Sequence, residues 1–151
     1  MKIYLFLVAI LTCAACSQRH ASQGTGPGPA VRTPAPWTAV SNGKLIYLTG
    51  RDRDGQKIVA AAAPLRPSCA ACHGANGAGG QKFPDGAVSA DLRHSVLVGK
   101  QKPPYTLATL QRAISQGIDN QGKPLDKVMP RWKLSQRDLH DVAQYVYSQL
   151  K

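Results

Sequence analysis

The chain has 151 residues, which leaves room for one small domain with a leader and a linker but not for two full domains. Nineteen Lys and Arg residues stand against eight acidic residues, and the formal net charge is +11 at pH 7. We therefore expect a single hydrophobic core under a basic surface that suits an anionic partner.

The first residues have the pattern of an export signal. Lys2 is followed by an apolar run over residues 3–11 that is too short to cross a bilayer as a mature helix. Two alanines then precede Cys16, as in a bacterial lipoprotein leader, where this cysteine becomes the lipidated N-terminus. We expect residues 1–16 to be a signal peptide and the protein to be lipid-anchored on the periplasmic side of a bacterial membrane. The alternative is an ordinary cleaved signal and a soluble periplasmic protein.

Residues 17–38 are rich in Gly, Pro, Ser and Ala and contain almost nothing to bury. This composition is typical of a flexible tether, which lets an anchored domain reach partners away from the lipid surface. The folded domain is then expected over residues 39–151.

A short N-terminal helix is predicted over residues 42–50, where an Asn-Gly pair precedes a compact apolar group that ends in glycine. A strand stays open as an alternative, because Ile46, Tyr47 and Thr49 also suit one. The acidic stretch 52–55 is interpreted as a polar turn, because the further ligands of a calcium loop are missing.

The sequence Cys69-Ala70-Ala71-Cys72-His73 is the attachment pattern of c-type haem. In this pattern both thiols bond covalently to the macrocycle, and the adjacent imidazole ligates the iron. The alternatives are a redox dithiol, which expects a βαβ setting, or half of a zinc site, which expects a second ligand pair. Neither setting follows in the chain, so one covalently bound haem c is predicted.

The glycine-rich residues 74–80 predict a loop that can pass close to a planar cofactor. Thr106 is suited to cap a helix, and Gly117 is suited to end it. Between them, one face of the predicted helix carries Leu107, Leu110, Ala113 and Ile114.

A second iron ligand is needed if the protein only carries electrons, because a six-coordinate iron changes little between its two oxidation states. Met129 is the single methionine outside the leader, and it stands in a loop before a proline. It is the predicted ligand opposite His73. His94 and His140 are kept as alternatives for that position.

A terminal amphipathic helix is predicted after Ser135, which forms a start resembling a capping box with Asp138. Apolar residues recur at helical spacing along it: Leu139, Val142, Ala143, Val146 and Leu150.

From about residue 42 to residue 151, the chain resembles class I c-type cytochromes. The attachment motif, the segment 118–132 around Met129 and the terminal helix carry the resemblance. It implies an all-α fold, a small helical domain wrapped around one haem, in which the first and last helices cross. It also implies that Cys69 and Cys72 are the thioether sites. One departure is the long segment 50–68 between the first helix and the motif.

These patterns predict an electron carrier rather than an enzyme. Export argues against nucleic acid as a partner, and a redox protein with an acidic docking surface suits the basic chain better. Four cations flank the methionine and are candidates for the docking surface: Lys123, Lys127, Arg131 and Lys133. The alternative functions are a haem subunit of an oxidoreductase complex, a ligand-sensing haem protein whose distal ligand is displaced, or a haem-free lipoprotein with a dithiol.

Overall fold

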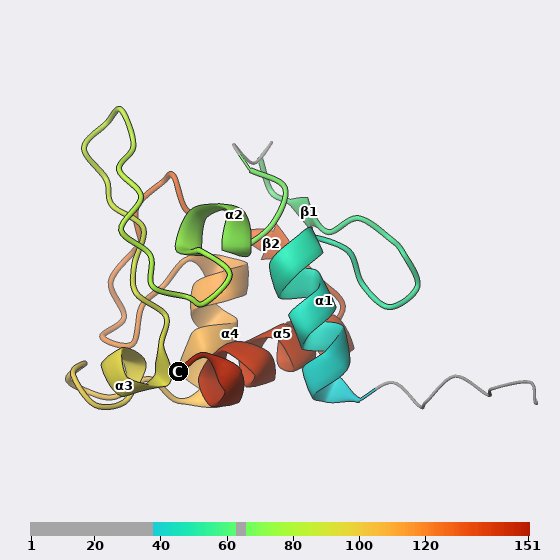
Figure 1. Cartoon of the computed structure of the whole chain (residues 1–151). Coiled ribbons are helices and arrows are strands. Elements are labelled where there is room, and N and C mark those ends of the chain that lie inside the picture. Colours follow the sequence, from blue (N-terminus) through green and yellow to red (C-terminus); the bar gives the residue numbers. More distant parts are fainter. Residues whose placement is uncertain (1–37, 63–65) are drawn as a thin grey trace, which may run out of the picture. The chain divides into compact units, whose positions relative to one another are not determined.

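The computed structural model describes residues 38–62 and 66–151 (Figure 1). The predicted signal peptide, Cys16 and all of the predicted tether except residue 38 lie outside these residues, so they stay predictions. In the described part of the chain, no helix is long and apolar enough to cross a bilayer.

Five helices and two short strands follow one another along the described chain. Their bounds are α1 Ala39–Thr49, β1 Val59–Ala60, α2 Ala70–His73, α3 His94–Leu97, α4 Leu107–Gln116, β2 Trp132–Lys133 and α5 Gln136–Gln149. The predicted helical fold is confirmed, with a small sheet added to it.

The three long helices begin where a hydroxyl side chain caps the first turn. Thr38 and Ser41 form a reciprocal capping box on α1, which therefore begins before the predicted residue 42. Thr106 caps α4 as predicted, and the backbone N–H of Asp138 donates to Ser135 at the start of α5. Glycine in the left-handed conformation follows both α1 and α4.

The first and last long helices pack closely against each other (Figure 1). A Cβ atom on Gly43 would overlap the backbone carbonyl of Asp141 and crowd the side chain of Tyr145, so only glycine fits at this contact. Ile46 and Tyr47 of α1 are fully buried there. The contact closes the fold by joining the two ends of the domain.

A single hydrophobic core lies between α1, α4 and α5. Its buried members are Ile46, Tyr47, Leu97, Leu110, Ala113, Ile114, Trp132, Leu139, Val142, Ala143, Tyr145, Val146 and Leu150. The predicted apolar face of α5 is buried throughout, and α4 buries all of its predicted face except Leu107, which is half-buried.

A buried polar cluster also joins α1 to α5. The amide nitrogen of Asn42 donates to Asp138 at 2.9 Å and to Asp141 at 2.8 Å, and its oxygen accepts the backbone N–H of Arg53 at 2.8 Å. Only 1% of Asn42 is exposed. Asn42 thus hydrogen-bonds two buried carboxylates at once, and no polar group of its own amide is left without a partner.

The segment 50–62, for which the sequence predicts only a polar turn, leads from α1 to the small sheet. Asp52 accepts backbone N–H groups within that predicted turn. The chain then forms β1, which pairs antiparallel with β2, with Val59 opposite Lys133 and Ala60 opposite Trp132 (Figure 1). The long connection therefore meets the segment that follows Met129.

The carboxylate of Asp138 makes stability depend on pH. Burial raises its pKa, but hydrogen bonds from Ser135 and Asn42 and the nearby Arg137 outweigh burial and hold the pKa below its ordinary value. A depressed pKa stabilises the fold at pH values above the unfolded pKa of about 3.9, and this contribution is lost as the pH falls through the folded pKa. We expect Asp138→Asn to be less stable than the parent by about 1–3 kcal/mol at pH 7, with a difference that shrinks in acid.

Urea unfolding of the haem-loaded proteins between pH 7 and pH 2 measures this difference. Asp85→Asn, a change at an exposed carboxylate, is the matched control and should follow the parent. A difference between parent and Asp138→Asn that stays constant across the range would contradict the assignment.

Candidate functional site

The attachment motif forms α2, a single turn of helix. The backbone N–H groups of Cys72 and His73 both donate to the carbonyl of Cys69, which places the two cysteines one turn apart. Both thiols are free and half-buried. Gly74 ends the turn, and its carbonyl accepts the Tyr47 hydroxyl at 2.7 Å, so the motif is tied directly to α1.

The imidazole of His73 has a fixed tautomer. Its Nδ1 lies 2.8 Å from the carbonyl oxygen of Ala90, which can only accept, so Nδ1 carries the proton and Nε2 keeps a free lone pair. Burial lowers the pKa of His73 more than the Ala90 contact raises it, which favours the neutral ring. A neutral imidazole with one bare nitrogen is ready to ligate a metal.

The segment 81–90 holds the Ala90 carbonyl in place. The Ser89 hydroxyl donates to the carbonyl of Cys72 at 2.8 Å and accepts the backbone N–H of Gln81 at 2.9 Å. A side chain on Gly79 would overlap the Ser89 and Ala90 backbone. Gly79, in the loop predicted over 74–80, therefore lets this loop approach the backbone of residues 89–90 next to His73.

The two thiols do not have the properties of a redox dithiol. Burial raises the pKa of Cys69 to about 12, and burial also raises the pKa of Cys72, against the opposing effect of Arg66. A reactive dithiol needs at least one thiol with a lowered pKa. The structure therefore favours cysteines that serve as attachment points.

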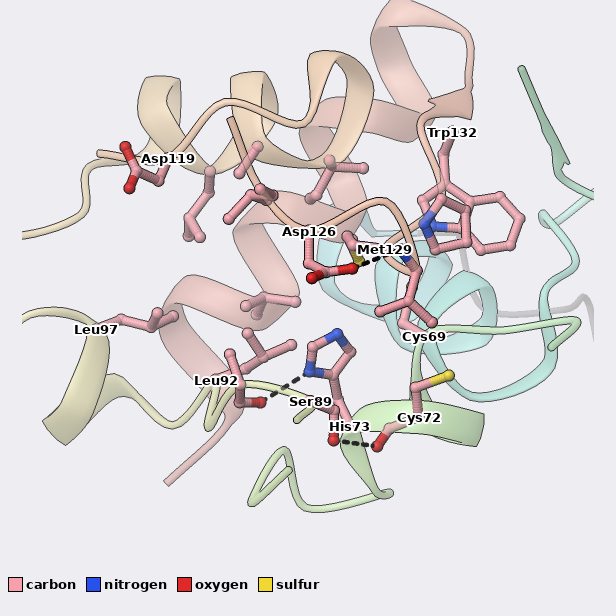
Figure 2. Close-up of a pocket in the computed structure, with 18 of the residues that line it drawn as sticks. Cys69, Cys72, His73, Ser89, Leu92, Leu97, Asp119, Asp126, Met129 and Trp132 are labelled. Carbon is pink, nitrogen blue, oxygen red and sulfur yellow. Dashed lines mark hydrogen bonds between the residues drawn. The ribbon is translucent and has the colours of Figure 1, made fainter. Parts of the chain in front are cut away.

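A cavity of about 280 Å³ opens beside α2 and is lined mainly by apolar side chains. Helices α4 and α5 form one wall of it with Leu110, Ala113, Ile114, Val142 and Val146, and Trp132 adds an aromatic surface. Figure 2 shows the ring of His73 pointing from α2 toward the loop that contains Asp126 and Met129. The cavity thus has the imidazole of His73 on one side and the thioether of Met129 on the other.

The structure places each predicted site residue. Cys69, Cys72, His73 and Met129 all line the one cavity. His94 and His140 do not: His94 bonds the Tyr147 carbonyl at 2.7 Å, and about half of the His140 side chain is exposed beside Asp141. Neither alternative ligand lines the cavity that contains Met129.

Sequence reasoning missed the groups that support the site. The Ala90 carbonyl orients His73. Every residue type has a backbone carbonyl, so no residue pattern marks this contact. Ser89 could have been marked only as a polar residue after the motif, and Trp132 only as the end of the segment that resembles the family.

The residues fit a flat apolar macrocycle with a central metal. The lining is mainly apolar, and it includes two thiols, an imidazole with a free nitrogen and a soft thioether sulfur. In the described residues, no cluster of three or more His, Cys, Asp or Glu side chains offers a separate metal site.

Comparison with known proteins supports this arrangement. The model of the family named Cytochrome c matches residues 52–149, which is more than half of the chain and includes the motif, the Met129 loop and α5 up to its last residue. No curated protein and no solved structure matches the chain.

Proposed function

Because the chain belongs to the cytochrome c family, whose members carry covalently attached haem c, we propose that it is a monohaem electron carrier with His73 and Met129 as its axial ligands. The observation that supports this proposal is the placement of His73 and Met129 on facing sides of one apolar cavity. When bound, haem c supplies an iron that gains and loses one electron.

The protein's own groups suit electron transfer better than bond chemistry. A thioether is a soft ligand that favours ferrous iron, so Met129 would raise the reduction potential. Two strong ligands would also keep substrates from the metal, and the apolar walls would exclude water. Cys69 and Cys72 would hold the macrocycle through thioether bonds at the edge of the cavity.

Replacing Met129 tests the ligand assignment. An oxidised parent protein should show the weak far-red band of charge transfer from methionine to ferric iron. Met129→Leu keeps the volume but removes the sulfur, so the band should disappear and the reduced protein should bind carbon monoxide. Val128→Ala, a change at the preceding residue of the same loop, should keep the band.

Absence of the band in the parent would contradict ligation by Met129. Rapid carbon monoxide binding by the reduced parent would then support the haem subunit of an oxidoreductase or a ligand sensor with an open iron.

We also propose that the mature protein is anchored by lipid at Cys16 on the periplasmic side of a bacterial membrane. The support is the leader pattern, in which two alanines precede Cys16 and a composition typical of a tether follows it. Such a tether would leave the haem domain free to meet redox partners.

Fractionation of cells tests the anchor. The parent should sediment with membranes and be released by detergent, whereas Cys16→Ser should be found in the soluble periplasmic fraction if it is still exported. Cys13→Ser is the matched control and should behave as the parent. Equal solubility of parent and Cys16→Ser would contradict the anchor.

An acidic redox protein is the proposed partner, docking beside the methionine loop, which we define as residues 125–130. Lys123, Lys127 and Lys133 are exposed around this loop. Arg131, the fourth predicted docking cation, is half-buried, and its guanidinium donates to backbone carbonyls of the loop. We therefore assign docking to the three lysines.

Oxidation of the reduced protein by anionic ferricyanide tests the role of these charges. The rate should fall steeply between about 0.01 M and 1 M salt, because the Debye length shrinks from about 30 Å to about 3 Å. Lys123→Glu with Lys127→Glu should slow the reaction at low salt and flatten the salt dependence. The control variant is Lys44→Glu, which makes the same Lys-to-Glu change at one exposed residue of α1. Parent rates that do not change with salt would remove the docking proposal.

A further inference from the structure

We propose that Arg131 is a positioning residue that keeps Met129 on the iron by holding the methionine loop closed. This inference rests on the proposed ligation by Met129. Arg131 would then help to retain the ligand, a role separate from the docking role that its charge predicts.

The guanidinium of Arg131 gathers carbonyls from both ends of the loop. Nη1 donates to the carbonyl of Asp126 at 2.8 Å and to the carbonyl of Met129 itself. Nη2 donates to the carbonyl of Leu125 at 2.7 Å. One planar group therefore fixes the residues before the ligand and the ligand's own backbone in one arrangement.

The end of α4 is shaped to receive this guanidinium. A Cβ atom on Gly117 would overlap Nε and Cζ of Arg131, so the glycine leaves the space that the side chain fills. The Gly117 carbonyl also accepts the backbone N–H of Leu125 at 2.7 Å. A cation is favoured at this place, because the carbonyl end of a helix carries partial negative charge.

The backbone of Arg131 is also held, by a hydrogen bond from the segment that follows β1. Its carbonyl accepts the backbone N–H of Ala61 at 2.8 Å, directly beyond β1. β1 pairs with β2, which begins at the next residue, Trp132. The side chain therefore connects the loop to the end of α4, and the main chain connects it to the sheet, so the loop is anchored to two separate elements.

Arginine is suited to this role in a way that lysine is not. Its planar fork presents five N–H donors in a fixed geometry, whereas a lysine ammonium is a point charge on a flexible stem. A lysine at position 131 would keep the charge, but it cannot reach the same three carbonyls at once. The conservative variant should therefore be intermediate between the parent and a neutral variant.

The consequence for the iron can be measured with a competing ligand. Added imidazole can bind the ferric iron only when Met129 has left it, so its apparent affinity rises with the population of the open loop. A residue that stabilised only the fold would change the unfolding midpoint without changing this affinity. Imidazole titration therefore separates positioning from general stabilisation.

We would titrate imidazole into the ferric, haem-loaded parent, Arg131→Met and Arg131→Lys, and record the far-red band of each. Arg131→Met should bind imidazole about tenfold more tightly or better, since hydrogen bonds from a charged donor to the closed loop are lost. Its far-red band should weaken. Arg131→Lys should lie between the two.

The matched control is Arg112→Met. Arg112 of α4 also donates a guanidinium bond to a nearby carbonyl, that of Asp119 at 2.5 Å, but it makes no hydrogen bond to residues 125–130. Arg112→Met removes the same positive charge and shortens the side chain as much as Arg131→Met does, and it should bind imidazole as the parent does.

Each outcome decides the proposal. An imidazole affinity and a far-red band equal to the parent's in a folded Arg131→Met would overturn the positioning role and leave Met129 ligation intact. The same is true if Arg112→Met loosens the ligand as much as Arg131→Met does. If Arg131→Met does not fold, Arg131→Lys decides: tighter imidazole binding supports the role, and unchanged binding overturns it. A parent without the band overturns both this inference and the ligand assignment.

Discussion

The hydrogen bond between Nδ1 of His73 and the carbonyl of Ala90 is the constraint on which the site depends. It leaves Nε2 bare and sets the plane of the ring, and a metal ligand needs both. The bond exists only because residues 81–90 fold back beneath α2, where Ser89 bonds the motif and Gly79 permits the close approach. A backbone group far from the motif in sequence thus determines what the motif can do.

The two sides of the cavity are built differently. On the histidine side, His73 belongs to a helical turn with several local hydrogen bonds, and α1 supports this turn through the Tyr47 hydroxyl. On the methionine side, Met129 belongs to a loop that is held by contacts with Arg131, Gly117 and the strand pair. The helical turn that carries His73 is fixed by local hydrogen bonds, whereas the orientation of its ring and the whole methionine side depend on contacts made in the completed fold.

This difference explains how much the sequence could predict. The start of α4 at Thr106 and of α5 at Ser135 follows from capping residues and apolar periodicity, which are local signals, and both were predicted. α1 begins earlier than the Asn-Gly pair predicts, because Thr38 and Ser41 form a capping box ahead of that pair. β1 and β2 have two residues each and exist through pairing across the chain, so no local pattern marks them. The sequence predicts only a docking cation at Arg131, because its partners are backbone carbonyls, which no residue type marks.

The contact of Gly43 with α5 has a practical consequence for anyone who trims this chain. The match to the family begins at residue 52, after α1 has ended. A fragment cut at that point would lose Ile46 and Tyr47 and leave the α5 face around Val142 open to water. It would also leave Asp138 and Asp141 without the amide of Asn42. The smallest fragment able to keep the core covered must begin at or before Thr38, so the segment recognised by sequence similarity is shorter than the segment that has to be expressed.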